Sequence, residues 1–113
     1  MIGSKKSTEV NSGLVTVIIT CRIKAGMMER AKRELEAICK TVMTKETACQ
    51  GIFVHVESKN PQRLLIIEYW DSEEIFTGPH MQSPHMQTFL KTAEVFVDGA
   101  TEFGFWHEIL AAT

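Results

Sequence analysis

The sequence lacks the features that mark a nucleic-acid-binding or membrane-anchored protein. Its 12 Lys and Arg residues are outnumbered by 14 Asp and Glu residues, the formal net charge is −2, and the basic residues form no cluster. Nucleic-acid-binding surfaces normally show as a basic stripe, so no nucleic-acid partner is expected. Residues 1–13 are polar, with no apolar stretch behind Lys5 and Lys6. They predict a flexible N-terminal tail and neither a signal peptide nor a membrane anchor.

Cysteine is scarce, and the chain is short. Cys21, Cys39 and Cys49 make an odd count without close pairs. This pattern favours three reduced thiols in the cytoplasm over a disulfide framework. A chain of 113 residues has the length of one domain, which we place at residues 14–113. A domain of this size buries a core but would gain from an oligomeric interface.

Four segments alternate in the way that β-strands do. They span residues 14–24, 52–57, 63–71 and 101–110. Residues 58–62, which separate the second segment from the third, are dense in turn formers and predict a hairpin. The third segment is apolar on both faces over most of its length, so we expect it to be a central strand covered on both sides.

Two segments carry the apolar spacing of an amphipathic helix. The first follows Gly26, which we expect to be its N-cap, and should end near Lys45 or Thr47. The second begins at Ser83, an N-cap residue followed by proline at the first helical position. We expect it to end at Asp98-Gly99.

A short helical turn is predicted between the third strand and the second long helix. Asp71 or Ser72 can cap it, and Glu73 and Glu74 lie where the positive end of the helix dipole favours carboxylates. Gly78-Pro79 is expected to end this turn.

This order of elements predicts the split βαβ arrangement of the ferredoxin-like α+β fold, an antiparallel sheet with helices on one face. The other face would expose Phe53, His55 and one row each of the third and fourth strands. Such a patch is too apolar for a soluble monomer. A homodimer that packs sheet against sheet would bury it and could leave a cavity on each side of the interface.

Three motifs are distinctive: Glu46-x-x-Cys49, Glu68-x-Trp70 followed by Ser72, and His80-x-x-Ser83-Pro84-His85. Together they resemble the antibiotic biosynthesis monooxygenase family of dimeric α+β barrels. The similarity spans roughly Leu14 to Leu110 in family order. It implies a homodimer with one pocket per subunit between the helices and the sheet. Known members include monooxygenases that oxidise quinols or aromatic polyketides with oxygen and no cofactor, haem-degrading enzymes, isomerases and proteins with no assigned activity.

Differences from the family's sequence patterns disfavour some of these activities for this chain. The family's haem degraders use an Asn on the first strand, a Trp near the position of His80 and a His within the second helix. This chain has no Asn on its first strand and carries Leu90 near the last of these positions. Haem degradation is therefore disfavoured. The Asn, Trp and Arg set of the polyketide monooxygenases is at most partly retained, with Trp70 as its candidate member.

His80 and His85 are the candidate catalytic residues. Their spacing lacks the i, i+4 geometry that places two imidazoles on one metal, so no metal site is expected. In one interpretation both bond to the backbone or to a carboxylate and hold the short turn against the second helix. In the other, one of them lines the pocket as a proton acceptor, since the pKa of histidine lies near working pH.

The candidate substrate-binding residues are mostly aromatic. Flat apolar side chains can form the walls of a site for a planar ring. They come from the predicted strands and comprise Trp70, Trp106, Phe53, Phe103 and Phe105, together with His55 and Glu68. Glu68, in an otherwise apolar strand, should either pair with Arg63, Arg22 or a histidine, or lie in the cavity with a raised pKa; pairing is favoured.

The sequence leaves three functions open. The first is a cofactor-independent monooxygenase that oxidises a small quinol or aromatic compound with molecular oxygen. The others are a non-catalytic small-molecule-binding dimeric barrel and an isomerase acting by proton transfer.

Overall fold

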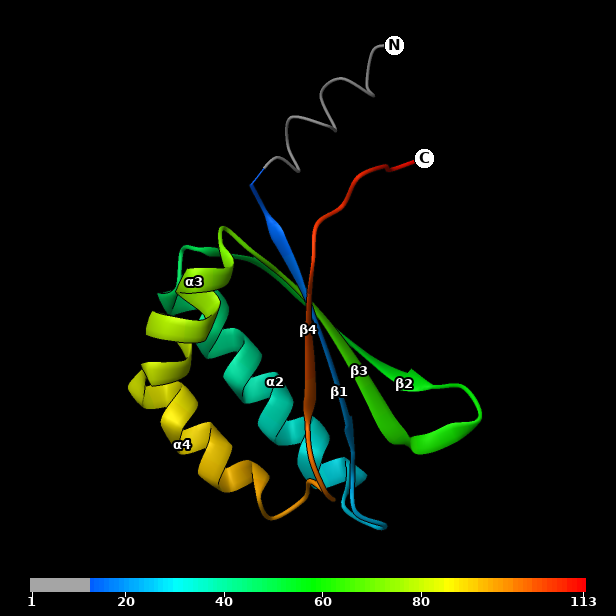
Figure 1. Ribbon diagram of the computed structural model, residues 1–113. Coiled ribbons are helices and arrows are strands. Elements are labelled where there is room, and N and C mark those ends of the chain that lie inside the picture. Colours follow the sequence, from blue (N-terminus) through cyan, green and yellow to red (C-terminus); the bar gives the residue numbers. More distant parts are fainter. Residues whose placement is uncertain (1–12) are drawn as a thin grey trace.

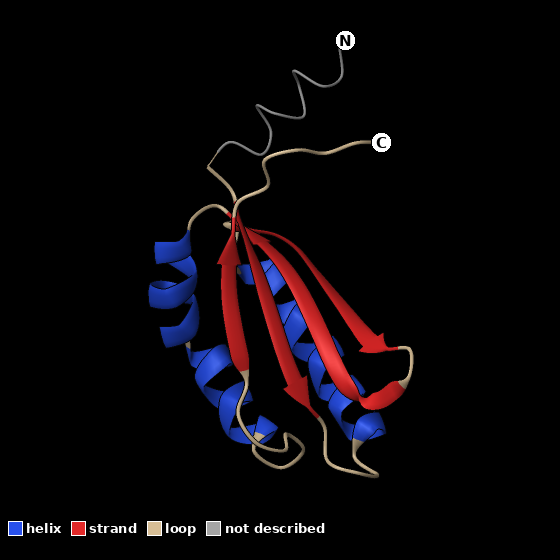
Figure 2. Ribbon diagram, turned by 45° about the vertical axis from the view of Figure 1, so that its right-hand side comes forward, coloured by secondary structure: helices blue, strands red, loops and turns tan. Residues whose placement is uncertain are grey.

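Four antiparallel strands form one sheet in the computed structural model, which describes residues 13–113, and all the helices lie on one face of it (Figures 1 and 2). The strands are β1 (Val15–Arg22), β2 (Cys49–Glu57), β3 (Asn60–Trp70) and β4 (Glu102–Trp106). The helical elements are α2 (Met28–Lys45), α3 (Glu73–Ile75), the π-helical turn η1 (Phe76–His80) and α4 (Pro84–Ala93). The strand order is β2-β3-β1-β4, which confirms the predicted ferredoxin-like α+β fold. The sheet does not close on itself, and all but Gly13 of the predicted tail lies outside the described residues.

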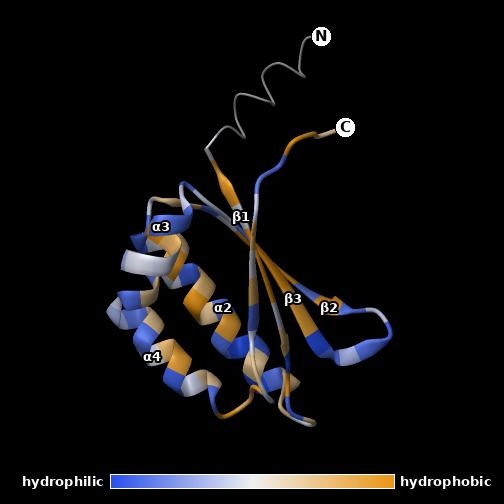
Figure 3. Ribbon diagram, in the orientation of Figure 1, coloured by the Kyte–Doolittle hydropathy of each residue, from blue (hydrophilic) through white to orange (hydrophobic). Residues whose placement is uncertain are grey.

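The alternation read from the sequence matches the two faces of the sheet. Val15 and Val17 of β1 are fully buried beneath the helices, whereas Thr16 between them points to the other face and is partly exposed. Trp70, paired with Val15 in the neighbouring strand, is also fully buried. As predicted, β3 is a central strand, with β1 on one side and β2 on the other. Figure 3 shows the apolar colouring of these strands.

Two clusters of buried residues make up the core along the sheet. One surrounds Trp70 and Phe76 near α3 and η1. The other surrounds Leu64 and Phe96 at the opposite end of α4. Leu35 of α2 packs against both clusters, so the long helix spans the two halves of the core.

The helix boundaries differ from the prediction at two ends. Gly26 does not cap α2, because it lies in a turn with a φ of 79° and Met27 is the N-cap. The second helix stops at Ala93 and does not reach Asp98-Gly99. After Ala93 the chain makes i→i+3 hydrogen bonds, such as Phe96 N to Ala93 O at 3.0 Å. The helix ends here because Val97 pairs with Ile23 beside the sheet.

Gly78-Pro79 does not end the short turn that precedes α4. Ser72 is the N-cap, as one of the two predicted alternatives, and its side chain accepts a hydrogen bond from the Ile75 amide. The chain then continues through Pro79 as η1. Proline cannot donate the hydrogen bond of an α-helix, and the wider π turn accommodates it. This turn carries His80 into the core.

The last strand is shorter than predicted. β4 ends at Trp106, which pairs with Thr16 near the start of β1. His107 makes one further contact, between its Nδ1 and the Leu14 carbonyl at 2.9 Å. Because β1 begins at Val15, it has no strand residue that could pair with the chain after His107. Ile109 and Leu110 are almost fully exposed.

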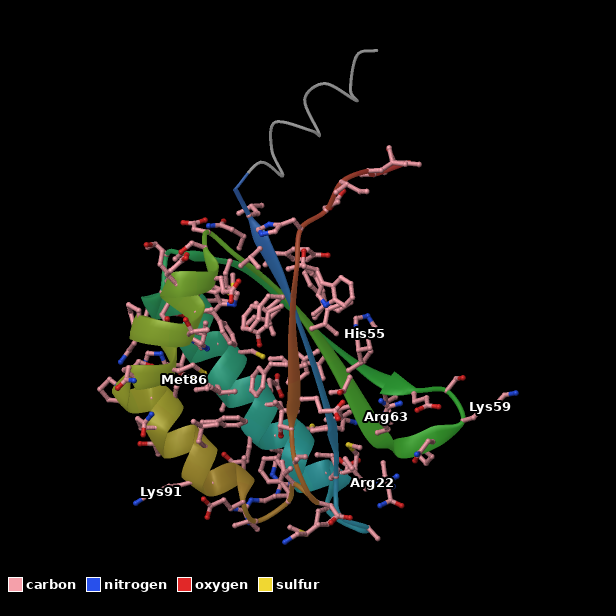
Figure 4. All side chains as sticks on the ribbon, in the orientation of Figure 1. Arg22, His55, Lys59, Arg63, Met86 and Lys91 are labelled. Carbon is pink, nitrogen blue, oxygen red and sulfur yellow. The ribbon has the colours of Figure 1, made fainter. Side chains whose placement is uncertain are left out.

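The sheet face opposite the helices is uncovered in this chain and carries apolar side chains. Phe53 is 52% exposed and Trp106 is 60% exposed. Figure 4 shows His55 and Arg63 on this side, away from α2 and α4.

Candidate functional site

A narrow cavity of about 120 Å³ lies between the sheet and the helices α2 and α4. Most of its wall is aliphatic or aromatic. The polar side chains of the wall are Glu68 and His80, with the thiols of Cys21 and Cys39 and the hydroxyl of Thr101. The apolar wall comprises Ile19, Ile23, Leu35, Ile38, Val42, Ile52, Val54, Leu64, Ile66, Phe76, Met81, Met86, Phe89, Leu90, Ala93, Phe96, Val97 and Phe103.

Glu68 is a buried carboxyl group held by a tryptophan. It lies on β3 and points to the helix face of the sheet, where it is only 8% exposed. The indole Nε1 of Trp70 donates a hydrogen bond to its Oε1 at 2.8 Å. Neither Arg22, Arg63 nor a histidine pairs with it among the described residues, so the favoured pairing was wrong. Burial raises the pKa of Glu68, and the Trp70 hydrogen bond opposes this rise.

His80 is held by a second carboxylate. Its Nδ1 lies 2.9 Å from Oε2 and 3.1 Å from Oε1 of Glu46. A carboxylate only accepts hydrogen bonds, so Nδ1 is the nitrogen that carries the proton in the neutral ring. Burial lowers the pKa of His80, which is 3% exposed, and the bond to Glu46 offsets part of that fall.

The other ring nitrogen of His80 is the atom available to a ligand. Nε2 has no hydrogen-bond partner among the described residues. Since no buried side-chain nitrogen or oxygen in this part of the chain lacks a partner, Nε2 must keep some accessible surface. His80 lines the cavity, and we therefore place Nε2 at the cavity wall. The same reasoning applies to Oε2 of Glu68.

Glu46 joins three elements through the two histidines. Its Oε2 lies 2.6 Å from Nε2 of His85 at the start of α4, while His80 reaches it from η1. Ser83 fixes the segment between the two histidines, because its Oγ donates to the His80 carbonyl at 2.7 Å and accepts from the Met86 amide at 3.3 Å. Glu46, the residue that ends α2, thereby anchors η1 and α4 to that helix.

Aromatic rings surround the imidazole of His80. The Trp70 ring lies 4.3 Å from it and the Phe76 ring 5.0 Å, centroid to centroid. This packing leaves the His80 side chain only 3% exposed, so little water reaches the ring.

The predicted site residues separate into four groups in space. Glu68 and His80 line the cavity, as does Phe103. Trp70 and Phe105 pack behind its wall against Phe76, at ring-centroid distances of 5.6 and 5.7 Å. His85 lines a surface groove between α2 and α4. The remaining three, Phe53, His55 and Trp106, lie on the uncovered face of the sheet.

Sequence reasoning missed the central place of Glu46. Its side chain is only 15% exposed, and both histidines bond to it. Its position in the family-like motif Glu46-x-x-Cys49, together with two histidines that needed a partner, was the available indication. Spacing alone could not reveal a contact across 34 residues of chain.

The cysteines offer no activated nucleophile. Burial is the main cause that raises the pKa of Cys39 and of Cys49 to about 11, and all three cysteines are free thiols. Within residues 13–113, no group of three or more His, Cys, Asp and Glu side chains has a geometry that could hold a metal ion. In the same range, none of the helices combines the length and apolarity needed to cross a membrane.

Comparison with known proteins gives a consistent fold. Residues 14–92 match the model of the family described as antibiotic biosynthesis monooxygenase. A proposed antibiotic biosynthesis monooxygenase from Bordetella bronchiseptica superposes with a TM-score of 0.80 at 16% identity, over 87% of this chain and 99% of that one. A conserved protein from Methanosarcina mazei Go1 gives 0.78 at 20% identity, over 88% and 98%. None of the curated proteins is a significant sequence match.

Proposed function

The chain belongs to the antibiotic biosynthesis monooxygenase family, and from this premise and the geometry of the cavity we propose that it oxidises a small quinol or phenol with molecular oxygen and without a cofactor. One observation carries the proposal. His80 lines an apolar cavity, and Glu46 holds its Nδ1, which leaves Nε2 as the ring nitrogen available to a ligand. A base oriented in this way and shielded from water is what the reaction requires of the protein.

The chemistry needs only one proton acceptor. His80 accepts the hydroxyl proton of the quinol at Nε2, and Glu46 stabilises the resulting imidazolium through Nδ1–H. The quinol anion is electron-rich enough to react with oxygen itself. One oxygen atom enters the ring and the other leaves as water, so that a quinol and O₂ give a hydroxyquinone and H₂O. The substrate supplies the electrons, and the protein remains unchanged.

Glu68 has a separate role in this proposal. Because its pKa is raised, its carboxyl group can stay protonated above the usual range and donate a hydrogen bond to a substrate oxygen. Trp70 fixes the position of this carboxyl. His85 acts through Glu46 as a positioning residue.

Oxygen uptake with a panel of chemically reduced quinones tests the proposal. We expect uptake above that of heat-unfolded protein and incorporation of one atom of ¹⁸O from ¹⁸O₂ into the product. His80→Asn should abolish the excess uptake, whereas His55→Asn, on the uncovered face, should leave it unchanged. A panel in which no quinol is consumed faster than with unfolded protein would count against the proposal.

The same experiment separates the alternatives. The contacts of Glu46 with His80 and His85 also hold η1 and α4 against the end of α2. These residues would have this structural role without any catalysis, so a non-catalytic binding protein is the second candidate. Ligand-induced thermal shifts without oxygen consumption would support that function. An isomerase would use the same base on a carbon-bound proton and would introduce solvent deuterium into its substrate.

We further propose that two copies associate through the uncovered face of the sheet. The exposed rings of Phe53 and Trp106 support this, since a patch of large apolar side chains is costly in water. A homodimer would also enclose His55 at the interface, apart from the cavity. The free thiols are consistent with a cytoplasmic location.

A further inference from the structure

The cavity is long compared with its volume. Along β3 its wall runs from Glu68 to Leu64, four residues that span about 13 Å at the usual rise of a strand. Along α4 it runs from Met86 to Ala93, which is about two helical turns. A volume of about 120 Å³ spread over this length describes a slender channel, well below the roughly 300–1,000 Å³ of pockets for drug-sized ligands.

The polarity of the channel changes from one end to the other. Glu68 and His80 share a neighbour, because the Trp70 indole donates to one and packs on the other, so both lie at the same end. The opposite end is formed by the second core cluster, which is made entirely of apolar residues. The wall there includes Ile23, Leu64, Ala93 and Phe96, and Thr101 stands at its exposed margin.

The channel is open along one side. Leu90 of α4 is 38% exposed and Phe103 of β4 is 45% exposed, although both contribute to the wall. These two residues face the space between α4 and β4. A ligand can therefore enter from the side and lie along the channel with its polar group at Glu68 and His80.

We propose that the ligand is a single-ring phenol or quinol with a short linear alkyl chain, whose ring oxygen lies between Glu68 and His80 and whose chain extends toward Leu64 and Ala93. This inference rests on the proposed function for the ring and adds the chain. A fused-ring phenol with the same number of carbons is shorter than a phenol with a butyl chain, so it does not reach Leu64 and Ala93. A ring with a chain of about four carbons matches the length estimated from the strand rise.

Binding of 4-alkylphenols, from 4-methylphenol to 4-hexylphenol, tests the inference without any need for turnover. Burial of one methylene is worth about fourfold in affinity. We expect the affinity measured by titration calorimetry to rise about fourfold per carbon up to about four carbons and then to level off. 1-Naphthol, the fused-ring comparison, should bind more weakly than 4-butylphenol.

Variants locate the chain at the apolar end. Ala93→Leu should remove the gain from chain length and leave 4-methylphenol binding nearly unchanged. Ala37→Leu, the same change at an exposed position of α2 outside the cavity wall, should have no effect. Should Ala93→Leu fail to fold, as judged by its thermal transition, Leu90→Phe narrows the channel at a partly exposed position. Glu68→Gln should weaken binding of every phenol without changing the increment per carbon.

The outcomes distinguish this inference from the proposed function. Affinity that is independent of chain length, or stronger binding of 1-naphthol, would overturn the alkyl-chain inference even if short quinols are oxidised. Affinity that increases with chain length without oxygen uptake would instead support the channel and contradict the monooxygenase. If affinity does not depend on chain length and no oxygen is consumed, both the alkyl-chain inference and the monooxygenase are overturned.

Discussion

Nδ1 of His80 lies 2.9 Å from Oε2 of Glu46, although 34 residues separate the two along the chain. The contact fixes the tautomer of the ring and so decides which nitrogen faces the cavity. Replacing Glu46 with Gln tests this directly. We expect a loss of roughly 10²-fold or more in oxygen-uptake rate with the fold retained, because the amide no longer stabilises the imidazolium.

A neighbouring carboxylate provides the control for Glu46→Gln. Glu36 lies exposed on α2, so Glu36→Gln should not change the rate. ¹⁵N chemical shifts of the His80 ring give a readout apart from activity. A wild-type ring protonated at Nε2 rather than at Nδ1 in its neutral form would contradict the assigned role of Glu46.

The pH dependence of kcat/KM follows from the lowered pKa of His80. The base is active when neutral, so the acidic limb of activity should lie below pH 6.5, the ordinary value for histidine. Glu46 raises the pKa of His80 and His85 lowers it. The acidic limb should therefore move to lower pH in Glu46→Gln and to higher pH in His85→Asn. A limb at or above pH 6.5 in the wild type would disagree with a buried base.

Stability should also depend on Glu68. Its pKa is raised above 4.5 in the folded protein, so between 4.5 and the folded pKa the native state binds more protons than the unfolded state. The free energy of unfolding must fall as the pH rises through that window. Glu68→Gln should remove this part of the pH dependence and leave the variant relatively more stable at high pH. Urea titrations from pH 4 to pH 9, compared with Glu57→Gln on the exposed hairpin, measure the difference.

The hydrogen bond from Trp70 to Glu68 provides a fourth prediction. Trp70→Phe leaves a buried carboxyl oxygen without its donor and should cost about 1–3 kcal/mol of unfolding free energy, with a further loss from reduced packing. The pKa of Glu68 should rise further, since the indole lowers it in the wild type. In a Glu68→Leu background, the same change should cost less because no carboxyl oxygen remains to be satisfied. Equal costs in both backgrounds would show that packing alone accounts for the effect.

The proposed homodimer predicts a sedimentation mass of twice one chain at micromolar concentration. Phe53→Lys combined with Trp106→Glu should reduce it to the mass of one chain, because charges would replace the apolar rings of the uncovered face. Met43→Lys, at an exposed position on α2, should leave the dimer intact. A wild-type mass of one chain would refute the dimer.

Much of the fold followed from local patterns. Ser72 and Ser83 cap helices because a hydroxyl at those points satisfies free amides, and the alternation of β1 reflects a sheet covered on one face. These effects act over a few residues and are visible in the sequence. The predicted end of the second helix was wrong because the real end depends on the pairing of Val97 with Ile23, which is far away in the sequence.

The candidate site was less predictable for the same reason. His80 was identified as unusual, but its partner Glu46 is brought to it only by the packing of η1 against the end of α2. Alternation divided each strand into two faces, but both Glu68 and Phe53 were predicted to bind the substrate, because alternation does not show which face meets the pocket. It could not predict that β4 places Phe103 on the cavity while Phe105 packs against Phe76.

The raised pKa values of the thiols also have a practical consequence. With pKa values of about 11, Cys39 and Cys49 carry almost no thiolate at neutral pH, so alkylating reagents should label both slowly, and the buried Cys49 only when the core around it opens. Cys39 lies in the cavity wall, whereas Cys49 belongs to the core cluster around Trp70. The labelling rate of Cys49 would thus report the opening of the core, whereas that of the partly exposed Cys39 would report access to the channel.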